Sequence, residues 1–162
     1  MSYGLDGFAF AVEALAGNAF GGRRARELRA VVLSATAWSG ATALMFSIFF
    51  WFAGSSLIGL MTNAADVIVV TDTYLPWVIV APMVSVWCYL LDGVFFGTMH
   101  TRDARNSMIV SAAGFACVVW LTPPALENHG LWLAVLTFMT LRGVVLALRY
   151  RTIERAAGRA TQ

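Results

Sequence analysis

An uncharged run, residues 73–91, most constrains what this chain can fold into. A helix needs roughly 20 apolar residues to cross the hydrocarbon core of a bilayer, and this run is long enough. Asp92 follows it, and the apolar sequence then resumes as far as Gly97 before the basic segment 102–105. A carboxylate inside a membrane helix is costly unless it faces a cavity or a partner. Asp92 is therefore the first candidate for a functional residue.

The composition places the whole chain in a membrane. Hydrophobic residues make up 59% of the sequence and charged residues 12%, whereas soluble domains average about 45–50% apolar and about 25% charged. The two cysteines, Cys88 and Cys117, lie in apolar runs without metal-ligand spacing, so both are interpreted as packing residues. We expect no cleavable signal peptide, because the first residues carry Asp6 and Glu13 and no base.

The apolar runs predict a bundle of five transmembrane helices, an all-α membrane protein. The helices are expected at about 3–20, 28–54, 66–98, 106–122 and 130–150, followed by a basic tail over 151–162. Pro76 and Pro82 predict a bend in the third helix, because each removes a backbone hydrogen-bond donor. Residues 57–61 are interpreted as a short interfacial piece, and residues 127–129 as part of a loop.

The arginines predict the orientation of the bundle. All eleven basic residues are arginine, and ten of them fall in the loops and tail at one end of a five-span arrangement. The loops around Asp66 and Glu127, at the other end, contain none. By the positive-inside rule, the arginine end and the C-terminus are cytoplasmic. We therefore expect a multi-pass protein of the plasma (inner) membrane that contacts lipid and no nucleic acid.

Three more charged residues are candidates inside the membrane. Asp6 and Glu13 are seven residues apart in the first helix, which places them on one face, and this helix needs neighbours to insert. Each of these acids, like Asp92, is interpreted either as a proton or cation site or as a structural partner for another helix. Arg142 interrupts the fifth span and is expected to be a structural counter-ion to one of the acids, with a substrate or gating role as the alternative.

Two aromatic residues near Asp92 are candidates to line a cavity. Trp87 and Tyr89 suit a flat, apolar cation, because aromatic faces attract positive charge. The alternative is that they face lipid or the interface, as most tryptophans and phenylalanines of the chain are expected to do. His100 and His129 fall in predicted loops and are interpreted as ordinary surface residues.

Two glycine pairs are spaced for close helix contact. Gly17 and Gly21 form one Gly-x-x-x-Gly pattern, and Gly93 and Gly97 form the other. Such patterns let helix backbones approach each other closely in membranes. Each pair follows a Leu-Asp-Gly triplet, a similarity that we attribute to chance in so biased a composition.

Two segments resemble the multidrug and toxic compound extrusion (MATE) transporters. Residues 5–30 read LDGFAFAVEALAGNAFGGRRARELRA, in which a helix ends in a Gly-x-x-x-Gly turn before a basic loop. Residues 86–107 read VWCYLLDGVFFGTMHTRDARNS and resemble a later helix of that family, with its acid and its basic exit. The first segment, with NHGLWLA at 128–134 and LRG at 141–143, is similar to the DNA-damage-inducible protein F (DinF) branch in particular.

The resemblance implies both a fold and a function. MATE members have twelve spans in two lobes, and the chain resembles the last five, so residues 1–150 are expected to be a partial C-terminal lobe. The implied function is part of a secondary active multidrug efflux antiporter, which exchanges protons or sodium ions for organic cations or amphipathic drug-like compounds by alternating access. By resemblance, Asp92 matches an acid linked to cation coupling in some branches, and Asp6 matches a position typical of the DinF branch. The missing N-terminal lobe is the expected partner, and the chain alone is predicted not to transport.

A membrane enzyme is a second functional class. A membrane enzyme of the CDP-alcohol phosphotransferase type needs Asp-Gly-x-x-Ala-Arg, whereas Asp92-Gly93 is followed by Val-Phe-Phe-Gly. We therefore expect neither enzymatic activity nor a metal or organic cofactor. The third class, which stays open as the alternative, is a small accessory protein or half-transporter that acts by binding a partner lobe.

Overall fold

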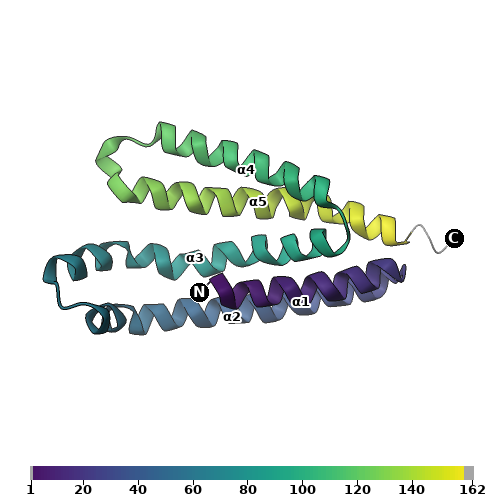
Figure 1. Ribbon diagram of the computed structural model, residues 1–162, viewed down its shortest axis with the longest axis horizontal. Helices are drawn as coiled ribbons and strands as arrows, with labels where there is room; N and C mark the ends of the chain where they lie inside the picture. The colour runs from purple at the N-terminus through teal and green to yellow at the C-terminus, as the bar shows by residue number, and fades with distance from the viewer. Residues whose placement is uncertain (1, 159–162) are drawn as a thin grey trace.

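The part of this chain that the computed structural model describes is helical almost throughout (Figure 1). It describes the backbone of residues 2–158 and the side chains of residues 7–123 and 125–158. Over that range the elements are α1 (Ser2–Gly21), α2 (Ala25–Met61), α3 (Ala65–Gly97), α4 (Thr101–Leu121), the 3-10 turn η1 (Pro124–Leu126) and α5 (Glu127–Gly158). The predicted all-α fold is confirmed.

Four of the helices, α2 to α5, are long and apolar enough to cross a membrane. With 37 residues, α2 is about 55 Å long, which exceeds the roughly 30 Å thickness of the hydrocarbon core. The surface of the bundle carries large apolar side chains, among them Trp38, Phe52 and Trp120, which are 71%, 81% and 85% exposed. Water-soluble monomers rarely expose so much apolar surface, so the chain is a multi-pass membrane protein.

The remaining helix, α1, is not among these candidate spans and depends on its neighbours. It lies against α2 and α3 and buries Val12, Ala16 and Ala19 (Figure 1). These side chains join Leu28 of α2 and Phe95 of α3 in the main core cluster. The prediction that this helix needs partners is therefore met within the chain itself.

Glycines bring α1 and α3 into backbone contact. A Cβ atom added at Gly93 would overlap the backbone of Ala9, and one added at Gly97 would overlap the backbone of Glu13. A Cβ on Gly17 would lie 2.8 Å from the carbonyl oxygen of Gly97. The close approach predicted for Gly93, Gly97 and Gly17 is thus present, whereas Gly21, the last residue of α1, has open space around it.

Successive helices run in opposite directions, which separates the charges. In Figure 1 the turns after α1 and α3 and the end of α5 lie on the right, whereas the turns after α2 and α4 lie on the left. Every described arginine except Arg142 belongs to the right-hand end, in residues 23–29, 102–105 and 149–155. We call this the arginine end. The opposite end carries Asp66 and Glu127.

The second helix extends beyond its predicted end. The interpretation of residues 57–61 as a separate interfacial piece is wrong, because α2 continues through them to Met61. Gly54 is buried in α2, and an added Cβ there would lie 2.7 Å from Leu75 Cδ1 of α3. In α3 the helix continues through Pro76 and Pro82. The bend predicted at these prolines stays a prediction.

The last helix is longer in both directions than its apolar run. Residues 127–129 form the first turn of α5 and not a loop. At the other end, α5 continues into the segment expected as a tail, because Ile153 and Ala157 are buried in the core. Their spacing of four residues places both on the face that meets the bundle.

The hairpin of α4 and α5 forms the other side of the bundle. On α4 a face of small residues, Ala104, Ser107 and Ser111, is buried, mainly against α5. The Ser107 hydroxyl donates to the carbonyl oxygen of Ala104 and the Ser111 hydroxyl to that of Ser107, both at 2.7 Å. The small face therefore packs closely without leaving its hydroxyl groups unsatisfied.

Candidate functional site

A buried ion pair joins α3 to α5 within the apolar part of the bundle. Asp92 Oδ2 lies 3.0 Å from Arg142 Nη2, and the two side chains are only 13% and 11% exposed. The pair exists because the apolar sequence around each residue keeps both helices in the membrane, where each charge is unfavourable without the other. Of the acids named as candidates, Asp92 is the one that the described structure pairs with Arg142.

The ion pair leaves hydrogen-bonding capacity unused. Cys88, one helical turn before Asp92, places its Sγ 3.7 Å from Asp92 Oδ2. Asp92 Oδ1 and Arg142 Nε are buried without a hydrogen-bond partner. A buried polar atom without a partner costs roughly 1–3 kcal/mol. This carboxylate can therefore accept a proton or contact a cation at Oδ1 while Oδ2 remains near the arginine.

An apolar groove of about 400 Å³ lies beside the ion pair, between α3 and α5. Leu91 and Gly143, the sequence neighbours of the paired residues, line it. Trp87 lines it as well and is 41% exposed, so one side of the groove is open at the surface. The remaining lining residues are Met83, Val84, Met139, Thr140, Val144 and Ala147. This composition suits a flexible apolar or aromatic group next to a buried charge pair.

The other predicted site residues do not join this arrangement. Tyr89 packs against Ala43 and Val86 and does not line the groove that Trp87 lines. Glu13 is half-buried on α1, and its carboxylate has neither an ion pair nor a hydrogen bond among the described residues. Asp6 belongs to α1, but its side chain lies outside the described residues.

The interpretation of both histidines as ordinary surface residues is wrong. His129 accepts a hydrogen bond at Nδ1 from Trp77 Nε1, at 2.8 Å, and its ring centroid lies 4.8 Å from that of Tyr74. His100 places Nδ1 2.8 Å from the carbonyl oxygen of Thr98 and packs edge-on against Phe20. Both rings are half-buried between elements.

Sequence patterns missed these contacts for different reasons. A loop was predicted over residues 127–129, and a residue placed in a loop is not expected to contact α3, as His129 does. The available signal was that Trp77 and His129 stand at the same end of the third and fifth spans. The approach of Cys88 to Asp92 could be read from their i, i+4 spacing.

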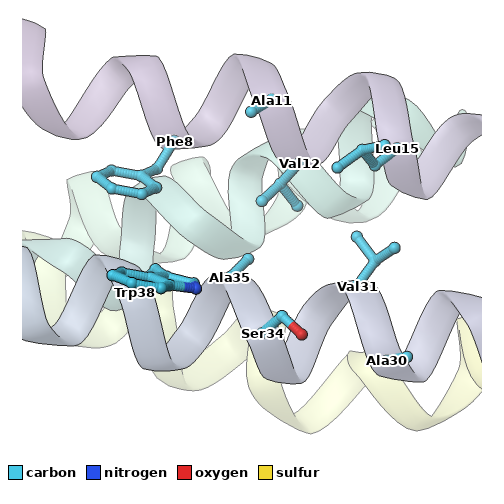
Figure 2. Close-up of a pocket in the computed structure, with 9 residues that line it drawn as sticks. All are labelled: Phe8, Ala11, Val12, Leu15, Ala30, Val31, Ser34, Ala35 and Trp38. Carbon is cyan, nitrogen blue, oxygen red and sulfur yellow. The ribbon is translucent and has the colours of Figure 1, made fainter.

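A second apolar groove, of about 390 Å³, lies between α1 and α2. Figure 2 shows Phe8 and Trp38 at one end of it, projecting from the two helices, and Leu15 and Val31 at the other. Among its lining residues none is charged. It contains none of the predicted site residues.

Comparison with known families decides what kind of bundle this is. The MatE family matches residues 3–123, a stretch that contains Asp92 but ends before Arg142. The chain belongs to the MatE family. The resemblance to MATE transporters inferred from the sequence is thereby confirmed.

A curated relative agrees with this assignment. Over 150 residues, 93% of this MatE chain, the sequence is 47% identical to "DNA damage-inducible protein F" of Escherichia coli (strain K12). The same alignment covers 32% of the relative, so the chain spans about a third of the length of the curated protein it matches. No solved structure gives a significant match.

Proposed function

We propose that this MatE chain is part of a secondary active antiporter that exchanges protons or sodium ions for organic cations or amphipathic drug-like compounds. The observation that carries the proposal is the buried pair of Asp92 and Arg142 beside an apolar groove. Intramembrane acids mark ion pathways in membrane proteins, and a free carboxylate oxygen is what a proton or sodium ion needs. Arg142 is the structural counter-ion that holds Asp92 in place.

The complete transporter would work by alternating access, with this chain as most of its C-terminal lobe. Binding of a proton or sodium ion at Asp92 weakens its attraction to Arg142, and this changes the contact between α3 and α5. Trp87 and the groove would contact the transported compound. Asp6 and Glu13 remain candidates for the coupling ion on the α1 side. The proposed protein is not an enzyme and uses no cofactor beyond its coupling ion.

The first test is efflux by the complete transporter, with this chain joined to or co-expressed with an N-terminal lobe in a pump-deficient strain. Asp92→Asn is expected to lower drug efflux by at least about tenfold, because an amide cannot exchange a proton or carry the compensating charge. Efflux of a fluorescent organic cation from loaded cells measures this. Asp66→Asn is the matched control, since Asp66 is exposed at the end of α3, and it should leave efflux unchanged. Normal efflux in Asp92→Asn would remove Asp92 from the coupling role.

The alternative function is an accessory protein or half-transporter that acts through a partner lobe. What favours it is that the chain spans 32% of its relative. Expressed alone in the same pump-deficient strain, the chain is expected to give no resistance, and efflux by the chain alone would overturn this. Crosslinking in native membranes to an N-terminal lobe supports a split transporter, whereas crosslinking only to an unrelated protein supports an accessory role.

The orientation of the bundle is a separate proposal, namely that the arginine end faces the cytoplasm of the inner membrane. Nine described arginines lie at that end, in residues 23–29, 102–105 and 149–155, and cytoplasmic loops carry such an excess. A cysteine placed at Asn63, in the turn after α2, should react with a membrane-impermeant maleimide added to whole cells. A cysteine at Arg105 should react only after the membrane is broken. The reverse pattern would invert the topology.

A further inference from the structure

The contact between Trp77 and His129 fastens the end of the bundle opposite the arginines. Trp77 lies in α3 and His129 in the first turn of α5, so the 2.8 Å hydrogen bond joins the two helices that also carry Asp92 and Arg142. Trp77 and Asp92 are separated by about 22 Å along α3, at 1.5 Å per residue. Two polar contacts therefore join α3 to α5: the hydrogen bond of His129 near one end of the bundle and the ion pair of Asp92 deep inside it.

The chemistry of this hydrogen bond determines which nitrogen of the neutral His129 ring carries the proton. An indole N–H can only donate a hydrogen bond. Nδ1 of His129 must therefore be the acceptor, with an available lone pair, and the ring proton must be on Nε2. When the ring takes up a second proton, both nitrogens become donors. The hydrogen bond with Trp77 is then lost, and two N–H groups face each other.

We propose that His129 is a proton-binding site that controls how tightly α3 and α5 are joined at the end opposite the arginines. The neutral ring holds the helices together through its hydrogen bond with Trp77, and the protonated ring loses this hydrogen bond. The pair of Asp92 and Arg142 stays in place, so the helices separate from the His129 end. This change in helix contact follows from protonation of His129 and does not depend on the proposed transport function.

The charged and titratable groups around His129 belong to α3 and α5. On α3 it faces Tyr74, and the acid of that helix nearest to Tyr74 in sequence, Asp72, accepts a 2.8 Å hydrogen bond from Ser55 of α2. On α5 the charged group nearest in sequence is Glu127, two residues earlier. Described residues 114–123 of α4 and its following turn, and 48–61 of α2, carry no charged side chain.

These groups act on a charged His129 ring in opposite ways. The acids and the aromatic faces attract an imidazolium ion, whereas the positive end of the α5 helix dipole and the donating indole oppose it. Histidine changes charge between roughly pH 5 and pH 8.

The test uses ¹⁵N-tryptophan spectra of the 162-residue chain in lipid nanodiscs. The indole signal of Trp77 is identified by its absence in Trp77→Phe. It should have a hydrogen-bonded shift at about pH 8 and lose that shift along a one-proton curve as the pH falls to about 5. In His129→Gln the pH-dependent change should vanish, because the glutamine carbonyl accepts a hydrogen bond but does not titrate. His100→Gln, at the other histidine, should leave the curve as it was.

Two results would overturn the proposal. One is a Trp77 signal that does not respond to pH in the unchanged chain, and the other is the same response in His129→Gln. Because a substituted chain can fail to fold, ¹⁵N-histidine spectra of the unchanged chain provide a second, independent test of the His129 tautomer. His129 should be the Nε2–H tautomer at about pH 8, and an Nδ1–H tautomer at that pH would refute the geometry on which the site rests.

Discussion

Gly97→Ala is expected to destabilise the bundle by about 1–3 kcal/mol or more, because it forces α1 away from α3. The added methyl group would overlap the backbone of Glu13. A backbone atom cannot avoid the overlap by changing rotamer, as the end of a side chain can. Gly93→Ala, which would meet the backbone of Ala9, is expected to act in the same direction. Thermal or denaturant unfolding in detergent micelles, followed by circular dichroism, measures the loss.

A glycine in open space provides the matched control for this prediction. Gly7 also lies in α1, but an added Cβ meets no atom within 4 Å. Gly7→Ala is therefore expected to be neutral or to stabilise the helix by about 0.5–1 kcal/mol, the usual advantage of alanine over glycine inside a helix. If Gly97→Ala unfolds at the same denaturant concentration as Gly7→Ala, the two helices are not in backbone contact.

Arg142→Met is expected to lower the stability of the bundle by about 3–5 kcal/mol, because it leaves Asp92 buried without its counter-ion. The double variant Arg142→Met with Asp92→Leu should recover most of this loss, since it removes the remaining buried charge and fills the same space with apolar groups. The double-mutant cycle is then strongly non-additive, as expected for residues in contact. Unfolding in detergent with increasing denaturant measures all four proteins.

An arginine on the same helix provides the control for charge removal. Arg149 is exposed, seven residues after Arg142, and has no ion pair among the described residues. Arg149→Met should change the free energy of unfolding by less than about 0.5 kcal/mol. Additive effects of the Asp92 and Arg142 substitutions would show that the two charges do not act on each other.

The fold class followed from simple counting, because a bilayer imposes a strong rule. Every backbone polar group in the hydrocarbon core needs a hydrogen-bond partner, and a helix provides one within a single segment, so long uncharged runs predict helices. The arginine pattern likewise predicted which turns share an end of the bundle, and the antiparallel arrangement in Figure 1 agrees. Helix ends were less accurate. The ends of α2 and α5 depend on contacts with neighbouring helices, as the burial of Ile153 illustrates.

The candidate site was only partly predictable. An acid inside an apolar run, Asp92, is unusual enough in sequence to be noticed, and so is Arg142. Their pairing could not be derived, because Glu13 and Asp6 were equally available partners by composition. Helix rotation decides it: α3 turns Asp92 towards α5, whereas Gly93 and Gly97 face α1. The same rotation separates Trp87, which faces the groove, from Tyr89, which does not.

The sequence by itself determined that this chain is a helical membrane protein, that its arginines gather at one end, and that charges lie within its spans. These properties follow from how single residues and single helices partition between water and lipid. Only the tertiary structure decided that Arg142 meets Asp92 and that Trp77 donates to His129. Such contacts depend on the rotation and spacing of whole helices. Glycine contacts and side-chain packing set that rotation jointly, and no local pattern records it.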